Sequence, residues 1–147
     1  MNLHLIKPNP NCENGCVPLF ATPVCAGFPS PAIGYESQEL NLHDYCVKNK
    51  PATFFLRVSG HSMKDGRIHN GDVLVVDRSL KPVHQCIVVA SVDNEFTVKQ
   101  LLLRPKPCLM PLNPAYAPIF IDVESERIEI WGVVTFSIMG HWYDRNH

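Results

Sequence analysis

The sequence predicts a mostly β fold: a compact, strongly bent sheet or small barrel preceded by an extended N-terminal arm. Two observations predict it, namely short apolar runs at close spacing from Thr53 onward and a proline-rich first segment. Short strands bounded by turn residues are typical of such small sheets and barrels. The length of 147 residues, with 46% hydrophobic and 18% charged residues, suits one folded domain with a tail.

Strands are expected over most of the chain after Thr53. They cover residues 53–58, 72–77, 87–92, 95–103, 108–112 and 128–138. Asp93 and Asn94 stand between two β-rich runs, which predicts a hairpin turn. Before the strands, residues 36–50 are expected to form one short helix with Ser37 or Asn41 as its cap.

Residues 1–34 differ from the rest of the chain. They contain Pro8, Pro10, Pro18, Pro23, Pro29 and Pro31. Prolines at this density prevent helix and interrupt sheet ladders, so an extended arm is expected, followed by a β-rich domain over residues 35–147. Because the arm also carries Val17, Phe20 and Phe28, we expect it to dock against its own domain or a neighbouring subunit.

Charge and hydropathy exclude several classes of protein. A formal net charge of −1 gives no electrostatic reason to expect tight nucleic-acid binding. No apolar run approaches the roughly 18–20 residues needed to span a membrane. The first residues lack the basic start and long apolar stretch of a signal peptide, so a cytoplasmic protein is expected.

The cysteines form no recognisable metal or disulfide motif. Cys12, Cys16, Cys25, Cys46, Cys86 and Cys108 are scattered, without a Cys-x-x-Cys pair. Cys12 and Cys16 with nearby His4 are the one zinc-like grouping, and structural zinc normally takes four well-placed ligands. We therefore expect reduced cysteines, some of them packed as small hydrophobes, and no metal or cofactor.

A glycine-flanked turn follows the strand at residues 53–58 and carries Ser62. Such a turn can lift a hydroxyl out of the core and point backbone N–H groups at the group that it attacks. The alternative is a serine that serves only as a turn or cap residue. A Ser-His-Asp set is not expected, because His61 adjoins Ser62 and the Gly-x-Ser-x-Gly elbow is absent.

Lys99 is a second polar residue in an unusual place, inside an apolar strand. Strand alternation places Thr97, Leu101 and Leu103 on its face. A free lysine has a pKa of about 10.4, but burial lowers it, and a neutral lysine can activate a serine. The alternative is an edge-strand lysine whose ammonium group reaches water.

Several stretches resemble the UmuD/MucA family of bacterial SOS-mutagenesis proteins, which are relatives of the self-cleaving domain of the LexA repressor. The similarity covers nearly the whole chain after about residue 17, in the same order. The matching stretches are residues 27–32, 59–63, 68–77, 96–105, 113–119 and 131–134. Residues 9–15 and 140–147 depart from the family pattern.

The resemblance implies a serine peptidase that cleaves its own arm. Ser62 would be the nucleophile and Lys99 the general base, and the N–H groups of Ser62 and Met63 would form the oxyanion hole. The bond cut would be Ala26–Gly27. A glycine after the cut allows the backbone to kink and approach the serine closely.

The resemblance also implies partners: a second copy of the chain, a RecA filament on single-stranded DNA that promotes the cut, and a UmuC-type Y-family polymerase. The trimmed product would join this polymerase for error-prone translesion synthesis. The alternative is a non-catalytic dimeric module that regulates a polymerase with its arm uncut. A repressor is disfavoured, since about 26 proline-rich residues before the cut are too few for a helix-turn-helix. A signal-peptidase-like enzyme would need a membrane anchor.

Overall fold

The computed structural model describes residues 2–6, 15–20, 37–122, 124 and 126–142. The chain divides into two compact units, residues 1–8 with 49–147 and residues 9–48. The larger unit carries Ser62 and Lys99, so it is the unit that matters for the site.

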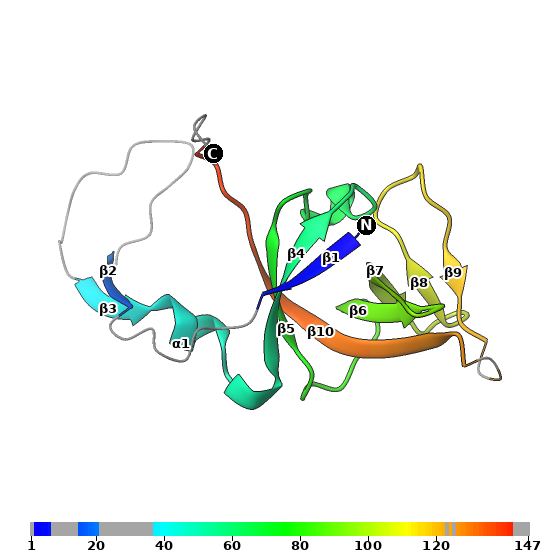
Figure 1. The fold of residues 1–147 in the computed structure, drawn as a ribbon, viewed down its shortest axis with the longest axis horizontal. Coiled ribbons are helices and arrows are strands. Elements are labelled where there is room, and N and C mark those ends of the chain that lie inside the picture. Colours follow the sequence, from blue (N-terminus) through cyan, green and yellow to red (C-terminus); the bar gives the residue numbers. More distant parts are fainter. Residues whose placement is uncertain (1, 7–14, 21–36, 123, 125, 143–147) are drawn as a thin grey trace. The chain divides into compact units, whose positions relative to one another are not determined.

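The larger unit is built on one eight-stranded sheet with the order β1-β4-β5-β10-β6-β7-β8-β9 (Figure 1). Every neighbouring pair is antiparallel. The strands are β1 Asn2–Ile6, β4 Thr53–Ser59, β5 Val73–Asp77, β6 Ile87–Val92, β7 Glu95–Leu102, β8 Cys108–Met110, β9 Ile119–Phe120 and β10 Ile128–Ile138. The predicted mostly β, strongly bent sheet is confirmed.

The long strand β10 joins the two halves of the sheet. It pairs with β6 along its first part and with β5 along its second part. The register shifts between Ile130 and Gly132 and again between Val134 and Phe136. Because a bulge bends a strand and increases its local twist, these two irregularities let β10 curve from one half to the other, as Figure 1 shows.

Two clusters of buried apolar side chains form the core. The first contains Leu56, Val58, Met63, Ile68, Leu74, Val76, Val89 and Val98. The second contains Val88, Ala90, Leu101 and Leu109. Met63 directly follows Ser62 and Val98 directly precedes Lys99, so the first cluster anchors the chain on both sides of the candidate site.

The strand predictions hold after Thr53. Each of the six predicted strands is present, and five of them end within one residue of the predicted limits. The strand β8 stops at Met110 instead of residue 112, because Pro111 has no N–H group for the ladder. Asp93 and Asn94 both have positive φ, 50° and 67°, as a two-residue type I′ hairpin turn requires.

The helix predicted over residues 36–50 is wrong in extent. Ser37–Asn41 is a strand, β3, which pairs with β2 at Cys16–Phe20. The helix α1 covers only Leu42–Cys46, and a 3-10 turn follows at Lys50–Ala52. Of the two proposed caps, Asn41 is confirmed, since its Oδ1 accepts a hydrogen bond from the Asp44 N–H at 3.1 Å.

Parts of the predicted arm form strands, so the prolines do not interrupt every ladder. Pro18 lies within β2, opposite Glu39 of β3. A two-stranded ribbon consists of two edge strands, where a missing N–H is tolerated. Cys12, Ala26 and Gly27 lie outside the described residues. Residues 34 and 35 do as well, so the boundary between them stays a prediction.

Two further findings concern helices and thiols. In the described ranges no helix is long and apolar enough to cross a membrane. The four cysteines within the described part of the chain, Cys16, Cys46, Cys86 and Cys108, carry free thiols. Two of these, Cys46 and Cys108, are buried, as expected for cysteines packed as small hydrophobes.

Candidate active site

Ser62 lies on the turn that follows β4. Gly60 opens this turn with a φ of +104°, a conformation that side chains rarely adopt. The Gly60 N–H, two residues before Ser62, donates to Oδ1 of the exposed Asn70 at 2.9 Å. Ser62 is 1% exposed, and the Met63 side chain beside it is fully buried in the first core cluster. The turn therefore holds the hydroxyl at a defined place.

The segment that follows β8, at Leu112 and Asn113, also contacts this turn. The Asp65 N–H donates to the Leu112 carbonyl at 2.8 Å. A Cβ at Gly66 would lie 2.5 Å from Leu112 Cδ1, so a larger residue there would require the Leu112 side chain to move. Asn113 Nδ2 donates to the His61 carbonyl at 2.8 Å. The sequence predicts no role for this asparagine, although it begins the stretch 113–119 that resembles the family and precedes a proline just after a strand.

Lys99 lies on β7, between β6 and β8, and is only 6% exposed. Its cross-strand partner is Val88, which is fully buried, and Leu101 two residues further is buried as well. Burial lowers the pKa of the Lys99 ammonium group, because an apolar setting disfavours the charged form. The edge-strand alternative for Lys99 is therefore wrong.

The Lys99 amine contacts Ser62. Nζ lies 3.1 Å from Ser62 Oγ, 2.7 Å from Thr97 Oγ1 and 3.0 Å from the Val98 carbonyl oxygen. An ammonium group donates to all three acceptors. A neutral amine keeps two donors for Thr97 and Val98, and its lone pair accepts the Ser62 proton. No carboxylate of the described residues pairs with Lys99.

The predicted oxyanion donors adjoin this contact. In the hydrogen bonds made among the described residues, neither the Ser62 nor the Met63 N–H is a donor. Within the described residues, neither N–H group is thus engaged in a hydrogen bond that holds the fold. Their function as an oxyanion hole stays a prediction, and so does the cut at Ala26–Gly27, which lies outside the described residues.

Known proteins are similar in sequence to this chain over most of its length. The Peptidase S24-like family matches residues 18–135. The chain belongs to this family. Protein MucA from Salmonella typhimurium is 63% identical over 125 residues, which is 85% of this chain and 86% of MucA. Protein ImpA from Salmonella typhimurium is 54% identical over 121 residues, or 82% of each chain.

A more distant relative broadens the comparison. A LexA repressor from Azoarcus is 35% identical over 113 residues, which cover 76% of this chain and 55% of the repressor. The predicted UmuD/MucA membership, with LexA as a distant relative, is therefore confirmed. Membership in the S24-like family implies a serine peptidase of the self-cleaving kind. The similarity to MucA and ImpA supports a role in SOS mutagenesis.

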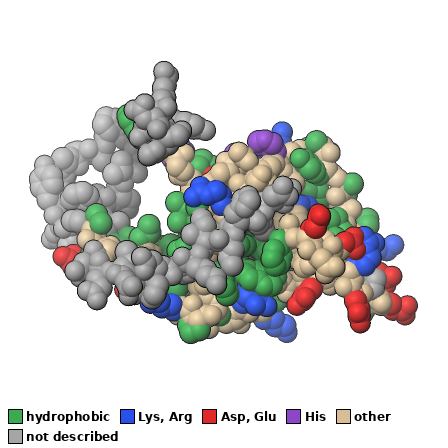
Figure 2. All heavy atoms as spheres, viewed as in Figure 1, with side chains coloured by type: hydrophobic (Ala, Val, Ile, Leu, Met, Phe, Trp, Pro, Cys, Tyr) green, Lys and Arg blue, Asp and Glu red, His purple; other side chains and the backbone are tan. Residues whose placement is uncertain are grey.

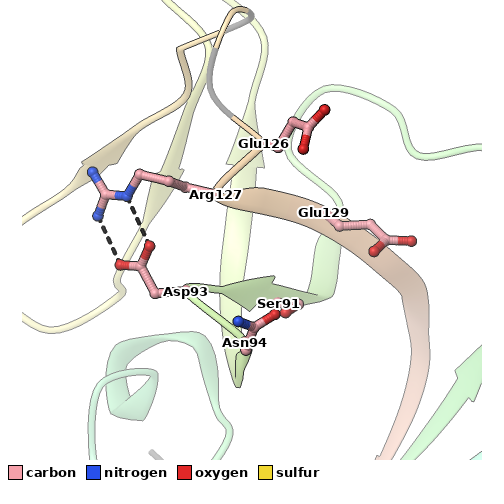
Figure 3. Close-up of a pocket in the computed structure, with 6 residues that line it drawn as sticks. All are labelled: Ser91, Asp93, Asn94, Glu126, Arg127 and Glu129. Atoms are coloured by element: carbon pink, nitrogen blue, oxygen red, sulfur yellow. Dashed lines mark hydrogen bonds and ion pairs between the residues drawn. The ribbon is translucent and has the colours of Figure 1, made fainter.

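This S24-like chain also has a polar pocket, at the far end of β7 from Lys99 (Figure 3). Asp93 lies in the turn of the β6–β7 hairpin, whereas Lys99 lies four residues beyond the start of β7 at Glu95. Arg127 forms a two-pronged ion pair with Asp93, with both N–O distances 2.8 Å. Acidic side chains gather at this end of the molecule in Figure 2.

The ion pair in that pocket has a structural explanation. The Asp93 N–H also donates to the Arg127 carbonyl at 2.9 Å, so the contacts fasten the β6–β7 turn to the start of β10. The Arg127 guanidinium lowers the pKa of the Asp93 carboxyl through its hydrogen bonds. Both side chains are more than half exposed, so salt screens the pair and it stabilises the fold little.

Thr97→Val is expected to lower the pH midpoint of any reaction that uses neutral Lys99. The Thr97 hydroxyl accepts a hydrogen bond from Nζ, and its loss disfavours the ammonium form more than the amine. The pH profile of Ser62 reactivity measures this change. Thr97→Ser is the matched control, since it keeps the hydroxyl. A midpoint that stays in place or rises in Thr97→Val would contradict the assignment.

Proposed function

We propose that this S24-like chain is a self-cleaving serine peptidase of the SOS response that cuts its own arm at Ala26–Gly27. The observation that carries the proposal is the buried contact of 3.1 Å between Lys99 Nζ and Ser62 Oγ. Burial lowers the pKa of Lys99, and no carboxylate partner in the described ranges raises it again, which shifts this lysine toward its neutral form. A neutral amine at hydrogen-bond distance is what a serine needs in order to lose its proton.

The proposed reaction has two stages. Neutral Lys99 takes the Ser62 proton while Oγ bonds to the carbonyl carbon of Ala26, and the Ser62 and Met63 N–H groups stabilise the resulting oxyanion. The bond to the Gly27 nitrogen then breaks, and the Lys99 ammonium returns the proton to this leaving amine. Water, deprotonated by Lys99, finally releases Ala26 from the acyl-enzyme.

The proposal extends to partners through the relatives that the chain matches. We propose that a RecA filament on single-stranded DNA promotes the cut by favouring the docked arm. The product beginning at Gly27 would act as a dimer with a UmuC-type Y-family polymerase in error-prone translesion synthesis, in the cytoplasm. The similarity to MucA over 85% of the chain supports these proposals.

The test is the mass of the purified protein after incubation. One sample stands at pH about 10, where the neutral fraction of Lys99, whose pKa is lowered by burial, is much larger than at neutral pH. Another sample contains RecA filaments at neutral pH. We expect a new fragment that begins at Gly27 in both. An intact mass in both samples would favour the alternative, a dimeric module that regulates a polymerase with its arm uncut. A fragment with another N-terminus would move the cleavage site.

A further inference from the structure

Asn113 contacts the peptide group that precedes the candidate nucleophile. Its side chain is 7% exposed, and its Nδ2 donates to the His61 carbonyl at 2.8 Å. Its Oδ1 is held in turn by the Ala115 N–H at 3.0 Å. Both ends of the amide are thus engaged with backbone, which fixes the orientation of this side chain.

The bond to His61 has a consequence for Ser62. The His61 carbonyl and the Ser62 N–H belong to one planar trans peptide group, in which the C=O and N–H bonds point in opposite directions. The carbonyl oxygen also accepts a second hydrogen bond, from the Lys64 N–H at 3.3 Å. With its oxygen held on one side, the peptide plane cannot rotate freely, and the Ser62 N–H faces away from Asn113.

We propose that Asn113 is a positioning residue that aims the Ser62 N–H at the developing oxyanion. The inference rests on the proposed function, because that function makes this N–H an oxyanion donor. Donors for an oxyanion act by being aligned before the reaction, so free rotation of the peptide reduces their effect. The hydrogen bonds of the Asn113 side chain go to His61 and Ala115, not to Ser62 or Lys99, so Asn113 acts through the His61–Ser62 peptide.

Asn70 offers a comparison, since its side chain binds the backbone of the same turn. It too is an asparagine that binds the turn backbone, through the Gly60 N–H at 2.9 Å. That N–H belongs to the Ser59–Gly60 peptide, which carries no proposed oxyanion donor. Asn70→Ala therefore loosens the turn without releasing the peptide that presents the Ser62 N–H.

The test measures how fast a fluorophosphonate labels Ser62, across pH, in the full chain. In this reaction Ser62 Oγ bonds to phosphorus, fluoride leaves, the serine proton passes to Lys99, and the phosphoryl oxygen occupies the place of the oxyanion. Labelling does not require the arm to be cut. Asn113→Asp keeps the acceptor for Ala115 but has no donor for His61. We expect it to label about tenfold to hundredfold more slowly. The pH midpoint is read from Asn113→Ala, which adds no charge near Lys99, and should be unchanged.

The outcomes separate the two proposals. Asn113→Ala should repeat the loss, and Asn70→Ala should label within about threefold of the unaltered chain; thermal melts identify any variant that has not folded. Equal labelling by a folded Asn113→Ala or Asn113→Asp would overturn the positioning role and leave the proposed function intact. A loss with a moved midpoint in Asn113→Ala would also overturn it, since Asn113 would then act on Lys99. An unaltered chain that is never labelled at Ser62 would overturn both.

Discussion

Ser62→Ala and Lys99→Met are each expected to slow the release of the fragment that begins at Gly27 by at least about 10³-fold. The alanine has no oxygen to form the acyl-enzyme. The methionine fills nearly the same buried volume but has no amine to take the proton from Ser62 Oγ. In the unaltered chain Lys99 Nζ lies 3.1 Å from this oxygen. Mass spectrometry of samples taken over time at pH about 10 measures both rates.

Three further variants make this result specific. Lys99→Arg retains a cation that does not lose its proton in proteins, so it should be as slow as Lys99→Met. Lys64→Ala changes an exposed lysine near Ser62, and Ser91→Ala changes a serine in the distant polar pocket; both should cleave within about twofold of the unaltered chain. Cleavage by Lys99→Arg at the normal rate would show that Lys99 supplies charge and not base.

The strands from Thr53 onward were predictable because apolar alternation and turn residues act locally. The Asp93-Asn94 turn is the clearest case, since both residues tolerate positive φ. The strands β2 and β3 were not predictable in this way. Their pairing places Pro18 opposite Glu39. Sequence propensity alone argues against a strand at this proline, but hydrogen bonds to the partner strand stabilise one.

The candidate site was predictable in part. The sequence indicated Ser62 through its glycine-flanked turn and Lys99 through its apolar strand, but neither pattern contains the distance between them. That distance depends on the bent sheet, which brings β7 to the turn after β4. Asn113 was missed because its contact with His61 joins positions 52 residues apart and involves a backbone carbonyl, which any residue possesses.

Cleavage is expected to accelerate with rising pH, because only the neutral form of Lys99 accepts the Ser62 proton. Below the lowered pKa of Lys99, the neutral fraction and the rate rise by up to about tenfold per pH unit, and both level off above it. Initial rates of fragment release between pH 6 and 10 measure the profile. A rate that is flat from pH 6 would place the pKa of Lys99 below this range or exclude lysine as the base.

The same pKa shift predicts how stability depends on pH. Between the folded pKa of Lys99 and the unfolded value near 10.5, the unfolded chain binds more protons than the folded chain. The free energy of unfolding therefore rises with pH across this window, by up to about 1.4 kcal/mol per pH unit. The full destabilisation from burying a charged Lys99 is present only below the folded pKa.

Urea unfolding of Ser62→Ala, with and without Lys99→Met, measures the contribution of Lys99 to stability, because neither variant cleaves itself. We expect the methionine variant to be the more stable at neutral pH, and its advantage to shrink as pH approaches 10. An advantage that is constant with pH would mean that Lys99 is charged in the folded chain, which would remove the physical basis for its action on Ser62.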